Sequence, residues 1–145
     1  MAVTVKNVVL WRTEVENKPG VLAKVLEPLT AAGADFKVLM GYRYPGAEEK
    51  AAIEIFPVTG KKVIAAAQAA GLSECSISTL LVEGDDKPGL GKTLAQALAE
   101  AGINIAFLMV QVVGRKYSAV FGFDKEEDAK KAASIIKRAA AAKRK

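Results

Sequence analysis

The chain contains no histidine and only one cysteine, Cys75, among its 145 residues. It therefore lacks the commonest acid–base group and metal ligand of proteins. A single cysteine excludes an internal disulfide framework, and Cys75 lies in a strand-like run where we expect an inert thiol. The carboxylates are spread over predicted turns and helix surfaces instead of forming a cluster. We therefore expect no catalytic residues, no metal site and no cofactor, and we predict that the protein is not an enzyme.

Long apolar runs and aromatic residues are also scarce. No apolar run approaches the ~20 residues that a membrane-spanning helix needs. The first residues, Met1-Ala2-Val3-Thr4-Val5-Lys6, do not have the pattern of a signal peptide. We therefore expect a cytoplasmic protein with no membrane partner. Aromatic residues make up 6% of the chain, and no run alternates Phe or Tyr with basic residues as RNA-stacking sheets require.

The net charge of +5 arises at the C-terminus. Five basic residues there account for the whole excess, and they are Lys137, Arg138, Lys143, Arg144 and Lys145. A basic end can contact nucleic acid or an acidic surface. Because the remaining charges balance, we interpret it as a short solvated end and expect no nucleic-acid partner.

One short stretch occurs twice at a fixed distance. Residues 17–22 read Asn-Lys-Pro-Gly-Val-Leu, and residues 86–91 read Asp-Lys-Pro-Gly-Leu-Gly. Pro19 and Pro88 are 69 residues apart. The same register aligns Glu14 with Glu83, Leu29 with Leu98, Gly33 with Gly102, Asp35 with Asn104, and Met40 with Met109. A fixed period over this span indicates an internal duplication into two modules of about 70 residues.

Each copy of this turn is predicted to join a strand to a helix. Proline is favoured at the first helical position, and Asn17 or Asp86 can cap the free N–H groups of the first turn. The adjacent glycine leaves the backbone open to another molecule. The exposed amides and the helix dipole favour an anion, either a carboxylate or a phosphate. A plain helix start explains one such turn equally well, whereas two matched copies favour a binding turn.

The remaining patterns alternate between strand and helix. The first copy predicts an extended run over 3–15, a helix that Gly33 ends, strands over 34–42 and 51–58, and a helix over 61–70 capped by Thr59. The second copy predicts an extended run over 72–83, a helix that Gly102 ends, a hairpin of 103–113 with 117–123, and a last helix. Asp124 and Glu127 are spaced as a capping box for that last helix.

Each copy therefore reads β-α-β-β-α, and one further strand would complete the split βαβ, ferredoxin-like plan. We predict an α+β fold of two ferredoxin-like βαββαβ modules in tandem, residues 1–70 and 71–145, with antiparallel sheets and helices on one face. The first copy can take its closing strand from residues 72–77. The second has no strand after its last helix, so we expect the N-terminal arm, residues 2–6, to complete its sheet.

The order of elements and the repeated turn resemble the ACT domain, a regulatory ferredoxin-like module of amino-acid metabolism. In the second copy the resemblance runs from the turn at 86–90 through Ala101-Gly102-Ile103-Asn104-Ile105. In the first copy it runs from the turn at 17–22 through Ala32-Gly33-Ala34-Asp35-Phe36. Together with the element order it covers nearly the whole chain. The chain thus resembles a stand-alone tandem ACT protein with no catalytic domain attached.

The resemblance implies a ligand, usually an amino acid, that is bound at an interface between two domains by the turn backbone and a polar residue of the next strand. The implied ligand-binding residues are Asn17, Lys18, Pro19, Gly20, Val21, Leu22, Asp35, Asp86, Lys87, Pro88, Gly89, Leu90, Gly91 and Asn104. Asp35 departs from the family's frequent Asn, and an acid there would repel a carboxylate. The second turn is therefore expected to be the better site.

The function that the resemblance implies is a non-catalytic regulatory protein that binds an amino-acid effector and forms a homodimer. The alternative is a regulatory subunit that acts through a biosynthetic enzyme, such as acetolactate synthase, without binding a ligand itself. A phosphate-binding loop is a further alternative, because Gly91-Lys92-Thr93 resembles the end of a Walker A run. However, Asp86 stands where that motif requires its first glycine.

Overall fold

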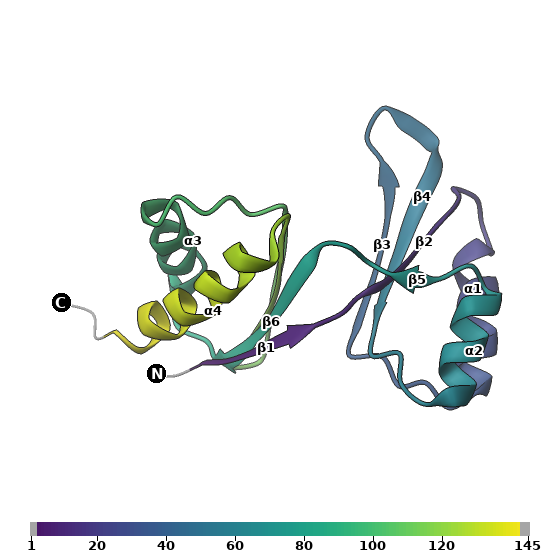
Figure 1. Cartoon of the computed structure of the whole chain (residues 1–145), viewed down its shortest axis with the longest axis horizontal. Helices are drawn as coiled ribbons and strands as arrows, with labels where there is room; N and C mark the ends of the chain where they lie inside the picture. Colours follow the sequence, from purple (N-terminus) through teal and green to yellow (C-terminus); the bar gives the residue numbers. More distant parts are fainter. Residues whose placement is uncertain (1–2, 143–145) are drawn as a thin grey trace. The chain divides into compact units, whose positions relative to one another are not determined.

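The computed structural model describes residues 3–142, and the chain divides into two compact units (Figure 1). Val9–Cys75 forms one unit, which we call the first module. The described residues before Val9 and after Cys75 form the other, which we call the second module. Each module contains a four-stranded antiparallel sheet and two helices, as the α+β, ferredoxin-like prediction requires.

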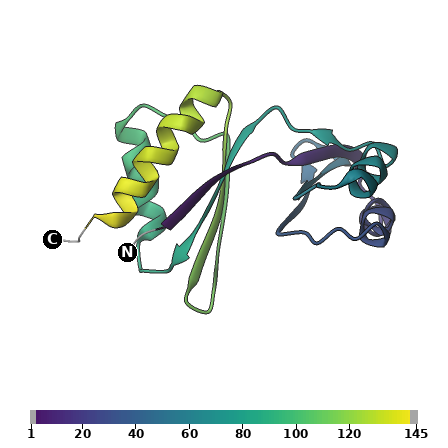
Figure 2. The same ribbon diagram turned by 60° about the horizontal axis from the view of Figure 1, so that its bottom comes forward.

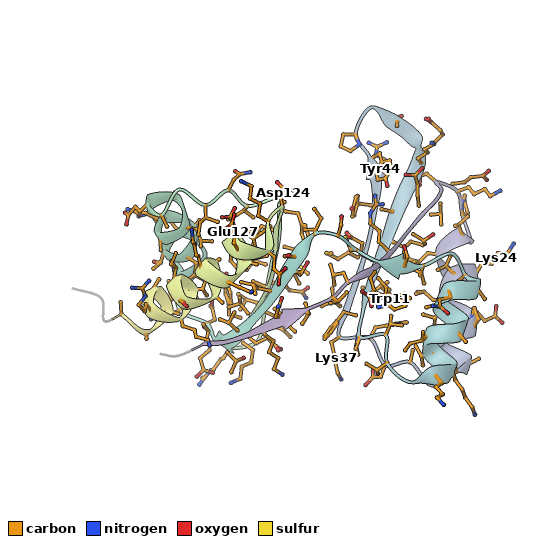
Figure 3. The ribbon with its side chains drawn as sticks, in the orientation of Figure 1. Trp11, Lys24, Lys37, Tyr44, Asp124 and Glu127 are labelled. Atoms are coloured by element: carbon orange, nitrogen blue, oxygen red, sulfur yellow. The ribbon has the colours of Figure 1, made fainter. Side chains whose placement is uncertain are left out.

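The sheet of the first module has the strand order β3-β4-β2-β5, and all its pairs are antiparallel. Its elements are β2 (Trp11–Glu16), α1 (Val21–Ala31), β3 (Val38–Tyr44), β4 (Ala47–Phe56), α2 (Lys61–Ala69) and β5 (Ser73–Glu74). β3 is an edge strand, and the turn at Pro45 and Gly46 joins it to β4. Tyr44 lies towards the tip of this hairpin (Figure 3).

The sheet of the second module has the order β1-β6-β8-β7, again with antiparallel pairs. Its elements are β1 (Val3–Val8), β6 (Ser78–Asp85), α3 (Leu90–Glu100), β7 (Phe107–Val113), β8 (Lys116–Phe123) and α4 (Glu126–Ala141). Figure 2 shows α3 and α4 together on one side of this sheet. β7 is the edge strand that corresponds to β3.

The predicted single run over 3–15 is two strands in two different sheets. Val9 and Leu10 separate β1 from β2. β1 pairs with β6 along its whole length, from Val3 opposite Gly84 to Val8 opposite Thr79. The closing strand of the first module is much shorter, since β5 has two residues and pairs only with Trp11 and Arg12. The modules therefore have closing strands of very different length.

The two helices that follow the repeated turn are held to their sheets unequally. Leu29 is the only buried residue of α1, whereas Leu90, Leu94 and Leu98 of α3 are all buried. A fully buried leucine contributes about 2 kcal/mol of hydrophobic stabilisation. The core of the second module is also extended by four buried residues of α4, which are Ala129, Ala132, Ile136 and Ala140.

Trp11, Ile53 and Ile55 pack against α2 residues Val63 and Ala67 in the core of the first module. The alternation of Ile53 and Ile55 along β4 places both on the helix-covered face. The only tryptophan of the chain thus has a structural position between the sheet and the helices (Figure 3).

The predicted side-chain caps do not form at either of the last helices of the modules. α2 has Gly60, not Thr59, at its N-cap, with no side-chain hydrogen bond. Lys125 occupies the N-cap of α4, so the expected capping box of Asp124 and Glu127 is wrong by one position. Both acids lie near the start of α4 (Figure 3). Glu126, Glu127 and Asp128 instead place negative charge in the first turn, where the helix dipole favours it.

Candidate functional site

The repeated Lys-Pro-Gly sequence forms the same tight turn in both modules. The N–H of Val21 donates to the carbonyl of Lys18 at 3.4 Å, and the N–H of Leu90 donates to that of Lys87 at 3.1 Å. Gly20 has φ 89 and ψ −15, and Gly89 has φ 82 and ψ 4. Proline at the second position and glycine with positive φ at the third define a type II turn.

This geometry corrects two predictions about the turn. Pro19 lies in the turn before α1, because the helix begins at Val21 with Gly20 as its N-cap. Neither helix has a side-chain cap. The amide of Asn17 instead donates to the carbonyl of Glu48 at 2.8 Å, and its N–H donates to the carbonyl of Glu49 at 2.9 Å. Asn17 therefore fastens the turn to β4 and leaves the first amides of α1 uncapped.

A cavity of about 300 Å³ lies beside this turn in the first module. The turn and the start of α1 contribute Asn17, Lys18, Val21 and Leu22, and the strands contribute Val15, Glu16, Gly41, Tyr42, Arg43, Ala51, Ala52 and Ile53. Its volume is at the lower end of the range of small-molecule sites. Apolar side chains from β2, β4 and α1 thus meet uncapped helix amides, which favour an anion.

Charged groups of both signs surround this cavity. Lys18 Nζ lies 2.8 Å from a carboxylate oxygen of Glu16, and Arg43 lies 3.5 Å from Glu48. The hydrogen bond from Lys18 lowers the pKa of Glu16, and the same contact raises the pKa of Lys18. At neutral pH both groups are therefore charged. Lys18 and Glu16 are also exposed. Lys18 can therefore pair with the carboxylate of a zwitterionic ligand, and Glu16 with its ammonium group.

The corresponding place in the second module is filled by Tyr117. Tyr117 lies opposite Gly84 on β6, and Ala51 lies opposite Val15 on β2. Because Val15 and Gly84 are 69 residues apart, Ala51 and Tyr117 occupy equivalent positions in the two modules. Tyr117 is 2% exposed and belongs to the core cluster that contains Leu90 and Ala119. A large buried ring thus occupies the position that a small side chain leaves open in the first module.

The polar residues expected on the strands lie in neither sheet. Asp35 and Asn104 are exposed and precede β3 and β7, because strand pairing begins only at Lys37 and Ala106, whose N–H groups donate to Phe56 and Gly122. Asp35 forms an ion pair with Lys37 at 3.1 Å. An 11-residue helix is about 16 Å long. Asp35 therefore lies at the opposite end of α1 from the turn.

The predicted residues are thus only partly gathered. Asn17, Lys18, Val21 and Leu22 line one cavity, while Pro19 and Gly20 form the turn between them. In the second module, Asp86 lines an open recess of about 370 Å³ with Asp85, Gly114 and Arg115. Lys87, Pro88, Gly89, Leu90 and Gly91 form the turn and the start of α3. Lys87 Nζ donates to the carbonyl of Ala140 at 2.9 Å, which ties this turn to α4.

Sequence reasoning missed a polar cluster around Glu54 on β4. Glu54 is 3% exposed, and its carboxylate accepts hydrogen bonds from Tyr42 at 3.1 Å and from the Cys75 thiol at 3.7 Å. Arg12 donates to the hydroxyl of Tyr44 beside it. Burial raises the pKa of the Tyr42 phenol, and the carboxylate of Glu54 raises it further. The only sequence signal was an acid between Ile53 and Ile55, which resembles a solvated strand face.

The alternative functions find little support in the geometry. Gly91, Lys92 and Thr93 lie inside α3 and do not form a phosphate-binding loop. Tyr117, Phe121 and Phe123 are buried in the core and cannot stack on bases. Over residues 3–142, no helix is long and apolar enough to cross a membrane. The described part of the chain also brings no three acidic or thiol side chains together as metal ligands.

Comparison with known proteins places this geometry in context. The model of the ACT domain family matches residues 78–143. No curated protein sequence matches the chain.

Several solved structures share the fold of the whole chain. A protein of Bacteroides thetaiotaomicron is 15% identical, with a TM-score of 0.71 over 92% of this chain and 98% of that one. The ligand-free regulatory subunit of aspartate kinase from Thermus thermophilus is 17% identical, with a TM-score of 0.63 over 96% and 97%. The allosteric aspartate kinase of Clostridium acetobutylicum is 18% identical, with a TM-score of 0.57 over 94% of this chain and 33% of that enzyme.

Proposed function

Residues 78–143 belong to the ACT domain family, and on this premise we propose that the protein is a regulatory module that binds an amino acid. The observation that carries the proposal is the cavity of about 300 Å³ at the start of α1. The sequence favoured the second turn as the better site. The geometry favours the first, because there the turn meets a largely apolar cavity.

The chemistry of the cavity indicates the class of effector. Val15, Val21, Leu22 and Ile53 offer apolar walls, which suit an aliphatic side chain. The uncapped amides of α1 and Lys18 suit a carboxylate, and Glu16 suits an ammonium group. We propose an aliphatic amino acid, with its charged groups at the mouth of the cavity and its side chain towards the sheet.

A screen of thermal unfolding against the twenty amino acids tests this function. A ligand that binds only the folded state raises its stability by RT ln(1 + [L]/Kd). L-valine, L-leucine and L-isoleucine should raise the midpoint most, and Leu22→Asp should abolish the effect because it places an acid beside the carboxylate site. Leu22 is exposed, so this change should leave the fold intact. No shift with any amino acid would contradict the proposal.

We also propose that the chain forms a homodimer through β7. This edge strand exposes Leu108, Met109, Val110, Val112 and Val113. Its outer backbone groups are open to pairing with another strand. A second copy of the same strand would pair antiparallel and cover these side chains. Sedimentation should then show a species of twice 15.3 kDa, and Val110→Lys should convert it to the monomer.

The proposed partner that responds to the effector is a biosynthetic enzyme of amino-acid metabolism. Similar folds occur as a regulatory subunit of aspartate kinase and as one third of an allosteric aspartate kinase. Co-purification with a candidate enzyme, in the presence and absence of the effector, tests this part separately.

A further inference from the structure

The side chain at one strand position beside the repeated turn differs in size between the two modules. In the first module this position is Ala51, which lies opposite Val15 on one side and Arg43 on the other. In the second module it is Tyr117, which lies opposite Gly84 and Val112. Val15 and Gly84, and likewise Arg43 and Val112, are 69 residues apart, so the two positions correspond strand by strand. Ala51 lines the cavity, and Tyr117 is part of the core.

The side chain of Tyr117 extends towards the turn of its own module. It packs in one cluster with Leu90, the first residue of α3. Burial raises the pKa of the Tyr117 phenol, and the negative charge of Asp86 at the start of the turn raises it further. Leu90 is 2% exposed, whereas its counterpart Val21 is only partly buried and lines the open cavity. The ring therefore occupies the space between the sheet and the start of the helix.

The hydroxyl group of Tyr117 explains little of this arrangement. It is buried and has no hydrogen-bond partner among the described residues. A buried polar group without a partner is destabilising. The tyrosine is therefore not held there by a hydrogen bond, and its contribution is the volume of its ring. In the first module, no side chain of the described residues fills the same space.

We propose that Tyr117 is a built-in occupant of the second module's effector cavity, so that the chain binds effector only in the first module. The residue at this strand position decides whether a cavity is present beside the turn, because alanine leaves the space open and tyrosine fills it. The identity of the effector rests on the proposed function. The filling of the second cavity does not, since it concerns only the packing of Tyr117.

The first experiment transfers the ring to the first module. Ala51→Tyr should fill the cavity and lower the affinity for a mixture of L-valine, L-leucine and L-isoleucine at least tenfold, measured by thermal shift. Ala47→Tyr is the matched control, because it adds the same side chain to the same strand at a residue that does not line the cavity. The control should bind like the native protein. Native affinity in a folded Ala51→Tyr protein would overturn the proposal.

The second experiment empties the cavity of the second module and refills it with p-cresol, which carries the ring and hydroxyl that the substitution removes. Saturating p-cresol should raise the unfolding midpoint of Tyr117→Ala by about 4 °C or more, because an emptied apolar cavity binds small aromatic molecules. Tyr117→Phe keeps the ring and should show no such shift. Toluene should act as well as p-cresol, since the hydroxyl has no partner.

The two experiments separate the possible failures. If the native protein does not respond to the amino-acid mixture, the proposed effector class is wrong, and the p-cresol experiment still decides whether Tyr117 fills a cavity. If p-cresol does not shift a folded Tyr117→Ala protein, the proposal is overturned whatever the effector is. Should Tyr117→Ala fail to fold, Ala51→Tyr still provides the decisive measurement.

Discussion

The first and second modules carry the same turn but differ in what lies behind it. In both, Lys-Pro-Gly forms a type II turn that leads into an uncapped helix. The first module leaves a cavity of about 300 Å³ beneath the start of its helix. The second fills the corresponding place with Tyr117 and buries three leucines of α3. A shared motif therefore determines the backbone at a site, while side chains outside the motif determine whether a ligand has room.

The comparison extends to how each sheet is closed. The second module is completed by β1, a six-residue strand, and the first by β5, which has two residues. The module with the filled cavity is also the one with the longer closing strand and the larger core. Under the proposed function, the first module is the sensing half and the second is its more extensively packed scaffold.

The largest expected effect follows from removing the N-terminal strand. Deletion of residues 1–6 should destabilise the second module by on the order of 4 kcal/mol, because it removes the buried side chain of Val3 and several ladder hydrogen bonds. Hydrogen exchange should then accelerate at Leu80 and Val82 on β6 and remain unchanged at Ile53 and Ile55 of the first module. Unchanged protection on β6 would show that β1 is dispensable.

A smaller change in stability is expected from alanine substitutions at two glycines, one in the second turn and one in the helix that follows it. Gly89 has φ 82, a conformation that costs other residues about 1–2 kcal/mol, so Gly89→Ala should lower the free energy of unfolding by that amount. Gly91 is helical, and a Cβ there would meet open space. Gly91→Ala should therefore be neutral or raise stability by up to about 1 kcal/mol. Urea denaturation measures both, and equal effects would contradict the turn geometry.

The positive φ of Gly89 also limits how the second turn can be tested as a binding site. A charged residue at Gly89 would strain the backbone as well as repel a carboxylate, so loss of binding would have two explanations. Gly91→Asp avoids the strain and corresponds to Leu22→Asp in the first module. If only the first module binds effector, Leu22→Asp should abolish binding and Gly91→Asp should leave it unchanged, as calorimetric titration can determine.

The smallest expected effect concerns the hydroxyl of Tyr117. Tyr117→Phe removes a buried polar atom without a partner and should raise the free energy of unfolding by about 1 kcal/mol. The native protein should also lose stability at alkaline pH. Burial raises the pKa of Tyr117, so the folded state holds the proton more tightly than the unfolded chain.

The stability that protonated Tyr117 contributes to the folded state is complete below pH ~10, the ordinary pKa of tyrosine. It is lost as the pH rises through the pKa of Tyr117 in the folded state. Tyr117→Phe should flatten the stability curve above pH ~10. Tyr42 remains in this variant, and its raised pKa will leave part of the alkaline slope. Identical alkaline curves for the native protein and the variant would show that Tyr117 is not buried as described.

The sequence alone determined the duplication, the α+β class and the resemblance to the ACT domain, because these depend on local patterns. A 69-residue period, apolar stripes of helical spacing and a Pro-Gly turn are visible without knowing which segments meet. The burial of Leu29, Leu94 and Leu98 follows directly from their spacing. Helix caps were less predictable, because a one-residue change in where the helix begins moves the cap from Asp124 to Lys125.

The tertiary structure alone decided where a cavity lies. The β3–β4 hairpin of the first module is three residues longer than the β7–β8 hairpin of the second. The 69-residue register therefore fails beyond the turns of these hairpins. Aligned at that offset, the sequence matches Tyr117 with Glu48 and not with Ala51. Only the strand pairing shows that Ala51 and Tyr117 are equivalent. Whether the space under a helix is open depends on the volume of a side chain from a distant strand. No local pattern reports that volume, because packing joins residues that the sequence keeps far apart.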